Sequence, residues 1–139
     1  MGWYARFTNA LNAKDTARAA LEFTKTWGEG LDHRGDSLTK PASKYVYNTT
    51  LATLKQYKME GWPNLQNNPQ AMEGLAGIKL PVLIIHGDKD LPFITTASEY
   101  MEKTISGSKR VLIKDVAHML NMEKPAEVNK LMMDFLDSK

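Results

Sequence analysis

The chain has 139 residues, 42% of them hydrophobic and 24% charged, a balance typical of one ordinary globular domain and not of a disordered or fibrous protein. The 18 Lys and Arg residues and the 16 Asp and Glu residues leave a formal net charge of +2 at pH 7, and opposite charges are interspersed, so we expect no nucleic-acid partner. The absence of cysteine excludes disulfides, thiolate catalysis and Cys-based metal centres.

The sequence also predicts no membrane association. No apolar run approaches the roughly 18 residues that a membrane span needs, and the start of the chain lacks the basic and apolar regions of a signal peptide. We therefore expect a cytoplasmic protein. No motif indicates a cofactor, and the spacing of the three histidines resembles no set of metal ligands.

Two helices are predicted in the first half of the chain. Residues 16–27 carry larger side chains at spacings of three and four, behind Asp15, whose side chain can cap a helix N-terminus. The run Gly28-Glu29-Gly30 is expected to end this helix. Residues 45–59 show the same helical spacing and predict a second helix, and the turn-rich stretch beyond it predicts a connection.

After residue 75 the pattern alternates between strand and helix. Residues 82–86 form an unbroken aliphatic run closed by glycine, which is typical of a buried parallel strand. A helix over 95–104, a short strand over 110–114 and a last helix from Pro125 follow. We therefore predict the α/β class: a helical segment over residues 1–75, then a βαβα unit with a short parallel sheet over residues 76–139.

The loops that follow the two predicted strands carry the polar residues. In open parallel sheets, working residues lie just beyond the carboxyl ends of the strands. The first loop reads Gly87-Asp88-Lys89-Asp90, and the second reads Asp115-Val116-Ala117-His118. Together with the apolar strand before the first loop, and with Glu123 and Pro125 behind His118, this pattern resembles the C-terminal part of an α/β-hydrolase from Ile78 to Leu136.

The resemblance implies a catalytic role for two residues. Asp90 matches the triad acid of the family, and His118 matches the base. The chemistry fits, because an imidazole can accept a hydroxyl proton near neutral pH while a carboxylate on its other nitrogen fixes the tautomer. Asp88 is the alternative acid, although in this pattern it is expected to cap the turn or the following helix. We expect Glu123 to contact the loop near the start of the last helix.

A further implication concerns the helical segment over residues 1–75, which matches the cap of the family. Its aromatic side chains are candidates for the walls of a pocket, and packing within an ordinary core is the alternative. These candidates are Trp3, Tyr4, Trp27, Tyr47 and Trp62.

The nucleophile of the family is missing from the sequence. No glycine lies in a Gly-x-Ser-x-Gly elbow between an apolar strand and a helix, and the glycine-rich oxyanion loop is absent as well. Gly35-Asp36-Ser37-Leu38 spells the serine block of the GDSL esterases, with Asp115 and His118 as the matching pair, but the residues before it cannot form the strand that this block closes. A GDSL-type esterase using Ser37 remains an alternative.

Two functional hypotheses follow. The chain is the cap and C-terminal portion of a hydrolase acting on an ester or related bond, with an incomplete triad that leaves it inactive alone, or it is a non-catalytic binding or assembly module derived from one. Two short parallel strands need neighbours, and an unpaired edge recruits another chain. We therefore expect self-association or a complementary chain that supplies the missing strands.

Overall fold

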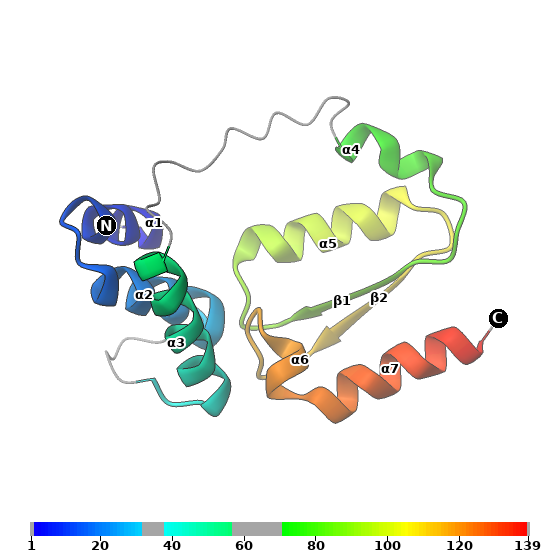
Figure 1. Cartoon of the computed structure of the whole chain (residues 1–139). Helices are drawn as coiled ribbons and strands as arrows, with labels where there is room; N and C mark the ends of the chain where they lie inside the picture. The colour runs from blue at the N-terminus through cyan, green and yellow to red at the C-terminus, as the bar shows by residue number, and fades with distance from the viewer. Residues whose placement is uncertain (1, 32–37, 57–70, 139) are drawn as a thin grey trace.

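The helices and strands of the protein form two units (Figure 1). The structure is a computed structural model and describes residues 2–31, 38–56 and 71–138. The first unit contains, in chain order, helix α1 (Trp3–Asn12), helix α2 (Thr16–Thr24), a π-helical turn (Lys25–Glu29) and helix α3 (Pro41–Gln56). The second unit contains β1 (Leu83–Gly87), α5 (Pro92–Thr104), β2 (Lys109–Ile113), α6 (Leu120–Glu123) and α7 (Pro125–Asp137). The short helices α4 (Ala71–Gly74) and η2 (Leu75–Gly77) precede β1.

The helices of the first unit follow their apolar spacing. Asp15 caps α2 as predicted, since its Oδ1 accepts a hydrogen bond of 2.8 Å from the backbone N–H of Arg18. The predicted helix over 16–27 is confirmed as far as Thr24, and the chain then widens into a π-helical turn that ends at Gly30, whose φ of 93° is in the left-handed region. Helix α1 was not predicted, although it buries Phe7 and Ala10.

The second predicted helix is present but starts earlier than expected. It begins at Pro41, where a proline at the first position costs no hydrogen bond, and is described as far as Gln56. The predicted end at residues 57–59 lies outside the described residues. The core of the first unit consists of alanine, leucine and phenylalanine side chains that the three helices bury together: Phe7, Ala10, Ala19, Ala20 and Leu54.

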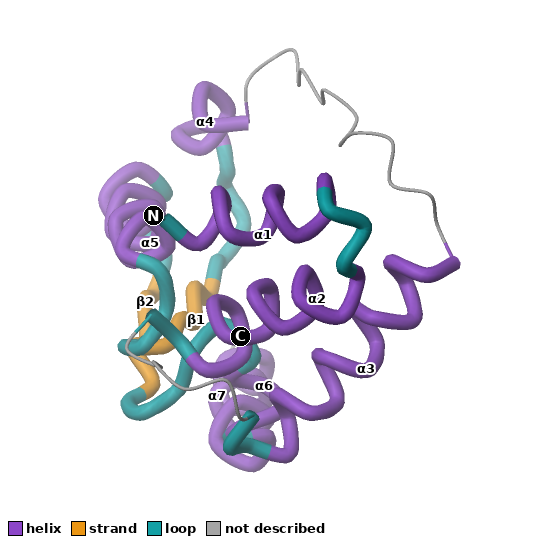
Figure 2. Tube along the Cα trace, turned by 90° about the vertical axis from the view of Figure 1, so that its left-hand side faces the viewer, coloured by secondary structure: helices purple, strands orange, loops and turns teal. Residues whose placement is uncertain are grey.

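The second unit confirms the predicted βαβα order. Strands β1 and β2 pair in parallel, with Leu83 opposite Lys109 and Gly87 opposite Ile113, and both begin and end within one residue of the predicted bounds. Figures 1 and 2 place α5 and α7 on opposite sides of the strand pair. A small core of Ile113, Val116 and Val128 joins β2 to α7.

The α/β class is therefore confirmed. The boundary at residue 75 stays a prediction. Within the described ranges, no helix has the length and apolarity that crossing a bilayer requires.

Candidate active site

The structure brings together the two residues that were predicted as acid and base. Asp90 lies three residues beyond the end of β1, and His118 lies five residues beyond the end of β2. Because the strands are parallel neighbours, both loops leave the same edge of the sheet. The Oδ2 atom of Asp90 lies 2.7 Å from Nδ1 of His118. The Asp90 side chain is 2% exposed, whereas that of His118 is 40% exposed.

The acid loop is fixed by backbone hydrogen bonds. The second oxygen of Asp90, Oδ1, accepts a bond of 2.7 Å from the Leu91 N–H. Asp88, the alternative acid, is exposed, and its N–H donates to the carbonyl of Ile113 over 3.0 Å. The carboxylate that meets His118 is therefore that of Asp90.

Gly87 allows the base loop to pass close to the end of β1. A Cβ atom at this position would lie 2.2 Å from the carbonyl oxygen of Val116 and 2.6 Å from that of Ala117, distances that no side chain can occupy. The Lys89 N–H also donates to the Val116 carbonyl over 2.9 Å. The glycine that ends the strand thus lets the two loops pack directly against each other.

Glu123 supports the base loop from α6, as the sequence predicted. Its Oε1 accepts a bond of 3.0 Å from the Ala117 N–H, one residue before His118, and its Oε2 bonds to Nζ of Lys40. The Glu123 side chain is only 6% exposed. Lys40 was missed by sequence reasoning, because no local pattern links two residues that are 83 positions apart.

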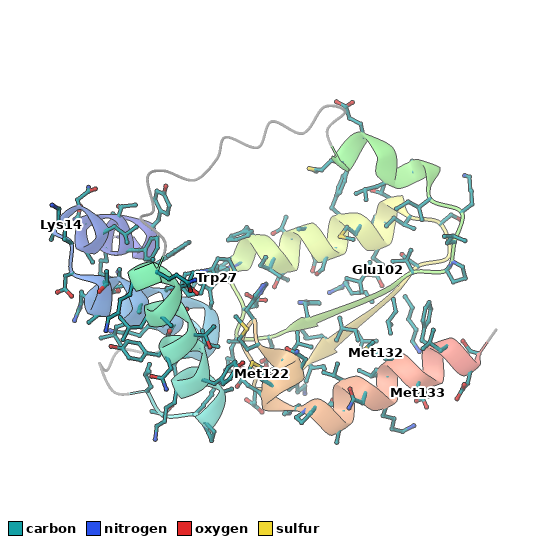
Figure 3. All side chains as sticks on the ribbon, in the orientation of Figure 1. Lys14, Trp27, Glu102, Met122, Met132 and Met133 are labelled. Carbon is teal, nitrogen blue, oxygen red and sulfur yellow. The ribbon has the colours of Figure 1, made fainter. Side chains whose placement is uncertain are left out.

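Trp27 is the aromatic residue that borders the pair. Its ring centroid lies 4.7 Å from that of His118, with an angle of 67° between the planes, and its carbonyl accepts a bond of 3.2 Å from the His118 N–H. Figure 3 shows Trp27 where the helical unit meets the second unit. Trp3 and Tyr47 pack on the helical core instead, which favours core packing for these two.

Tyr4, another candidate for a pocket wall, is 58% exposed. Trp62 and Ser37 lie outside the described residues, as does His33, one of the three histidines. No group of three potential metal ligands occurs in the parts of the chain that are described.

His86 lies within the second unit and is buried. It is 2% exposed, with Nε2 at 3.0 Å from Nη1 of Arg110. Burial, aided by the Arg110 charge, lowers the pKa of His86 below its usual value of 6.5.

The pair has the geometry of a general base and its orienting acid. A carboxylate on Nδ1 favours the tautomer whose proton sits on that nitrogen, which leaves the lone pair of Nε2 available to accept a proton. No described residue bonds to Nε2 of His118, and the ring is partly open to solvent.

Comparison with known proteins identifies the fold. The model of the α/β hydrolase fold matches residues 1–125. The chain belongs to the α/β-hydrolase fold family. The predicted partial α/β-hydrolase fold is thereby confirmed.

Several relatives of this hydrolase-fold chain are enzymes. It is 29% identical to a proline iminopeptidase of Lactobacillus crispatus, over 96% of the chain and 45% of that protein. It is 31% identical to pig bifunctional epoxide hydrolase 2, over 61% and 17%, and 33% identical to mouse monoacylglycerol lipase ABHD6, over 48% and 20%.

Solved structures agree on the fold of this hydrolase-family chain. A bromoperoxidase from Bacillus anthracis matches with a TM-score of 0.64 and 24% identity, over 97% of this chain and 48% of that one. The carboxylesterase CesB from Bacillus subtilis matches with a TM-score of 0.60 and 19% identity, over 99% and 45%. The chain thus spans less than half the length of these relatives.

Proposed function

We propose that Asp90 and His118 are the acid and the base of a hydrolase that acts on an ester or a related bond. The observation that carries this proposal is the 2.7 Å contact between the Asp90 carboxylate and Nδ1 of His118, with the His118 ring still partly exposed. Nε2 of His118 would take the proton of a nucleophile, and the buried Asp90 carboxylate would stabilise the imidazolium.

The nucleophile of the proposed hydrolase is expected to lie on another polypeptide. The 139 residues contain no Gly-x-Ser-x-Gly elbow, and an acid–base pair without a nucleophile and oxyanion donors accelerates hydrolysis little. We therefore infer that the chain is inactive alone, and that a complementary polypeptide of the hydrolase fold supplies the nucleophile.

The strand pair offers the place where such a polypeptide joins. Within the described residues β1 and β2 pair only with each other, so each strand keeps an unpaired edge, and such edges recruit further strands. The alternative to a complementary polypeptide is self-association through this edge. Sedimentation of the purified chain distinguishes these alternatives, because a self-associating chain sediments as an oligomer. A dilute monomer with a cooperative melt would overturn both self-association and the need for a complementary polypeptide.

A second candidate function is a non-catalytic assembly module. The exposed apolar side chains Leu112, Met132 and Met133 of the second unit favour it, because exposed apolar side chains support association without chemistry. The GDSL alternative is disfavoured by geometry, since the carboxylate on Nδ1 of His118 is that of Asp90 and this alternative needs Asp115.

Hydrolysis of p-nitrophenyl acetate tests the proposal. The chain is assayed alone and together with a hydrolase-fold polypeptide that carries a Gly-x-Ser-x-Gly elbow, with His118→Gln and Asp90→Asn as variants and Asp88→Asn as the matched control. We expect activity only in the mixture, lost in His118→Gln, strongly reduced in Asp90→Asn and unchanged in Asp88→Asn. Activity of the chain alone that depends on His118 would contradict the incomplete triad, and a mixture that forms but is inactive would favour the assembly module.

A further inference from the structure

The π-helical turn Lys25–Glu29 and the Gly30 that follows it contact both loops of the candidate site. A π-helical turn is rare and wider than an α-helical one, and such turns occur frequently at functional sites. Here the turn follows directly on α2 and ends at a glycine in the left-handed region. The helical unit thereby reaches the edge of the sheet where Asp90 and His118 lie.

Trp27 makes two contacts with the base. Its carbonyl accepts the His118 N–H over 3.2 Å, and its indole packs edge to face on the imidazole at 4.7 Å. The indole is held in turn by Trp3, at 5.6 Å between ring centroids, and by Phe93, at 6.2 Å. Trp27 thus contacts both the backbone and the ring of His118, and its own ring packs on Trp3 of the helical unit and on Phe93 of the second unit.

Gly30 contacts the acid loop. A Cβ at this position would lie 2.7 Å from the carbonyl oxygen of Lys89, the residue directly before Asp90. The Lys89 N–H is bonded to Val116 of the base loop. A displacement of Lys89 would therefore disturb the approach of the two loops.

We propose that residues 25–30 form a positioning segment that holds the acid loop and the base loop together, with Trp27 as the positioning residue for the His118 imidazole. The catalytic roles of the two loops rest on the proposed function, whereas their contacts with the segment do not. The segment makes the geometry of Asp90 and His118 depend on the docking of the helical unit.

Two glycines give a matched test of the segment. Gly30 and Gly107 both have positive φ, so alanine is strained at either position, but nothing lies within 4 Å of a Cβ at Gly107. The readout is the Nδ1 proton of His118, which NMR detects far downfield when its bond to Asp90 protects it from exchange. We expect Gly107→Ala to keep this resonance and Gly30→Ala to lose it. Retention in a folded Gly30→Ala protein would overturn the role of Gly30.

Fluorescence tests the contact between Trp27 and His118 in the folded chain. The variant Trp3→Phe/Trp62→Phe keeps Trp27 as its sole tryptophan and an aromatic ring at position 3, and an imidazole that contacts an indole quenches its emission. We expect the addition of His118→Gln to change the Trp27 emission at a fixed pH and the addition of Asp88→Asn to leave it unchanged. An emission that is the same with and without His118→Gln would overturn the contact.

Side-chain replacement at Trp27 separates positioning from simple packing. We expect Trp27→Leu to lose the protected Nδ1 proton of His118 and Trp27→Phe to restore it, because an aromatic ring at this position restores the contact. Equal retention in both variants would overturn the positioning role. If the hydrolysis assay fails while the NMR and fluorescence results are as expected, the proposed function is rejected and the positioning role of the segment stands. The two proposals can therefore be rejected independently.

Discussion

The two units of the chain differ in how completely they bury their apolar side chains. The helical unit closes a core around Phe7, Ala20 and Leu54, and its central carboxylate, Glu22, is fully buried and paired with two arginines. The second unit has a smaller core and leaves much of α7 exposed, including Met132 and Met133 (Figure 3). The unit that carries the Asp90 and His118 pair is therefore the less closed one.

The largest expected effect lies at the junction of the two loops. Gly87→Ala places a methyl group against the backbone carbonyls of Val116 and Ala117, and the backbone must move to admit it. We expect a loss of about 3 kcal/mol in the free energy of unfolding, measured by urea denaturation. Gly77→Ala, where nothing lies within 4 Å, is the control and should change stability by less than about 1 kcal/mol. Equal effects would show that the loops can move apart.

The buried carboxylate of the helical unit comes next. The Oε2 atom of Glu22 accepts a hydrogen bond of 2.7 Å from Nε of Arg6, and its Oε1 atom forms an ion pair of 2.7 Å with Nη2 of Arg18. We expect Glu22→Gln to lower the free energy of unfolding by about 2 kcal/mol, because it removes the buried charge that pairs with both arginines and weakens the charge-assisted hydrogen bond from Arg6. Glu127→Gln changes an exposed pair with Lys124 at 3.8 Å and should cost less than about 0.5 kcal/mol. Similar values for the two variants would mean that burial adds nothing to the Glu22 pairs.

A smaller effect is expected at the N-terminus of α2. Asp15→Ala removes the acceptor for the Arg18 N–H and should cost about 1 kcal/mol, while Asp15→Asn keeps an acceptor and should cost less. Amide hydrogen exchange then shows where the loss falls. We expect faster exchange in α1, α2 and α3 with little change in β1 and β2; uniform acceleration would show that the two units unfold as one.

The smallest effect is a pH dependence in the second unit. The pKa of His86 is lowered by burial and by Arg110, against the opposing charges of Asp90 and Glu99. The unfolded chain therefore binds a proton more readily, so stability is full above pH 6.5 and falls as the pH drops through the lowered value. We expect the urea concentration at the midpoint of unfolding to decrease as the pH is lowered from about 7.5 to about 5.5, and to decrease less in His86→Gln. His118→Gln is the control, and an unchanged slope in His86→Gln would contradict the assignment.

Much of the fold follows from local patterns. The apolar run of β1, the helical spacing of α2 and the cap at Asp15 are each encoded within a few residues, and each is confirmed. Helix α1 was missed because its apolar positions lie among polar residues with no capping side chain at Gly2. Helices α4 and α6 have four residues each, too few for a period to appear.

The candidate site was predictable only in part. Asp90 and His118 follow strands in a recognisable order, so their meeting could be expected. The contacts of Trp27 with His118 and of Lys40 with Glu123 join distant parts of the chain, and packing of the two units creates them. Such contacts leave no spacing signal in the sequence.

We expect Asp90 to set the tautomer of His118, and ¹⁵N NMR of the His118 imidazole in the full chain tests this role. In the wild type the proton should lie on Nδ1 and the lone pair on Nε2, with a shift toward the other tautomer in Asp90→Asn and none in Asp88→Asn. A wild-type proton on Nε2, or a tautomer unaffected by Asp90→Asn, would contradict this role of Asp90.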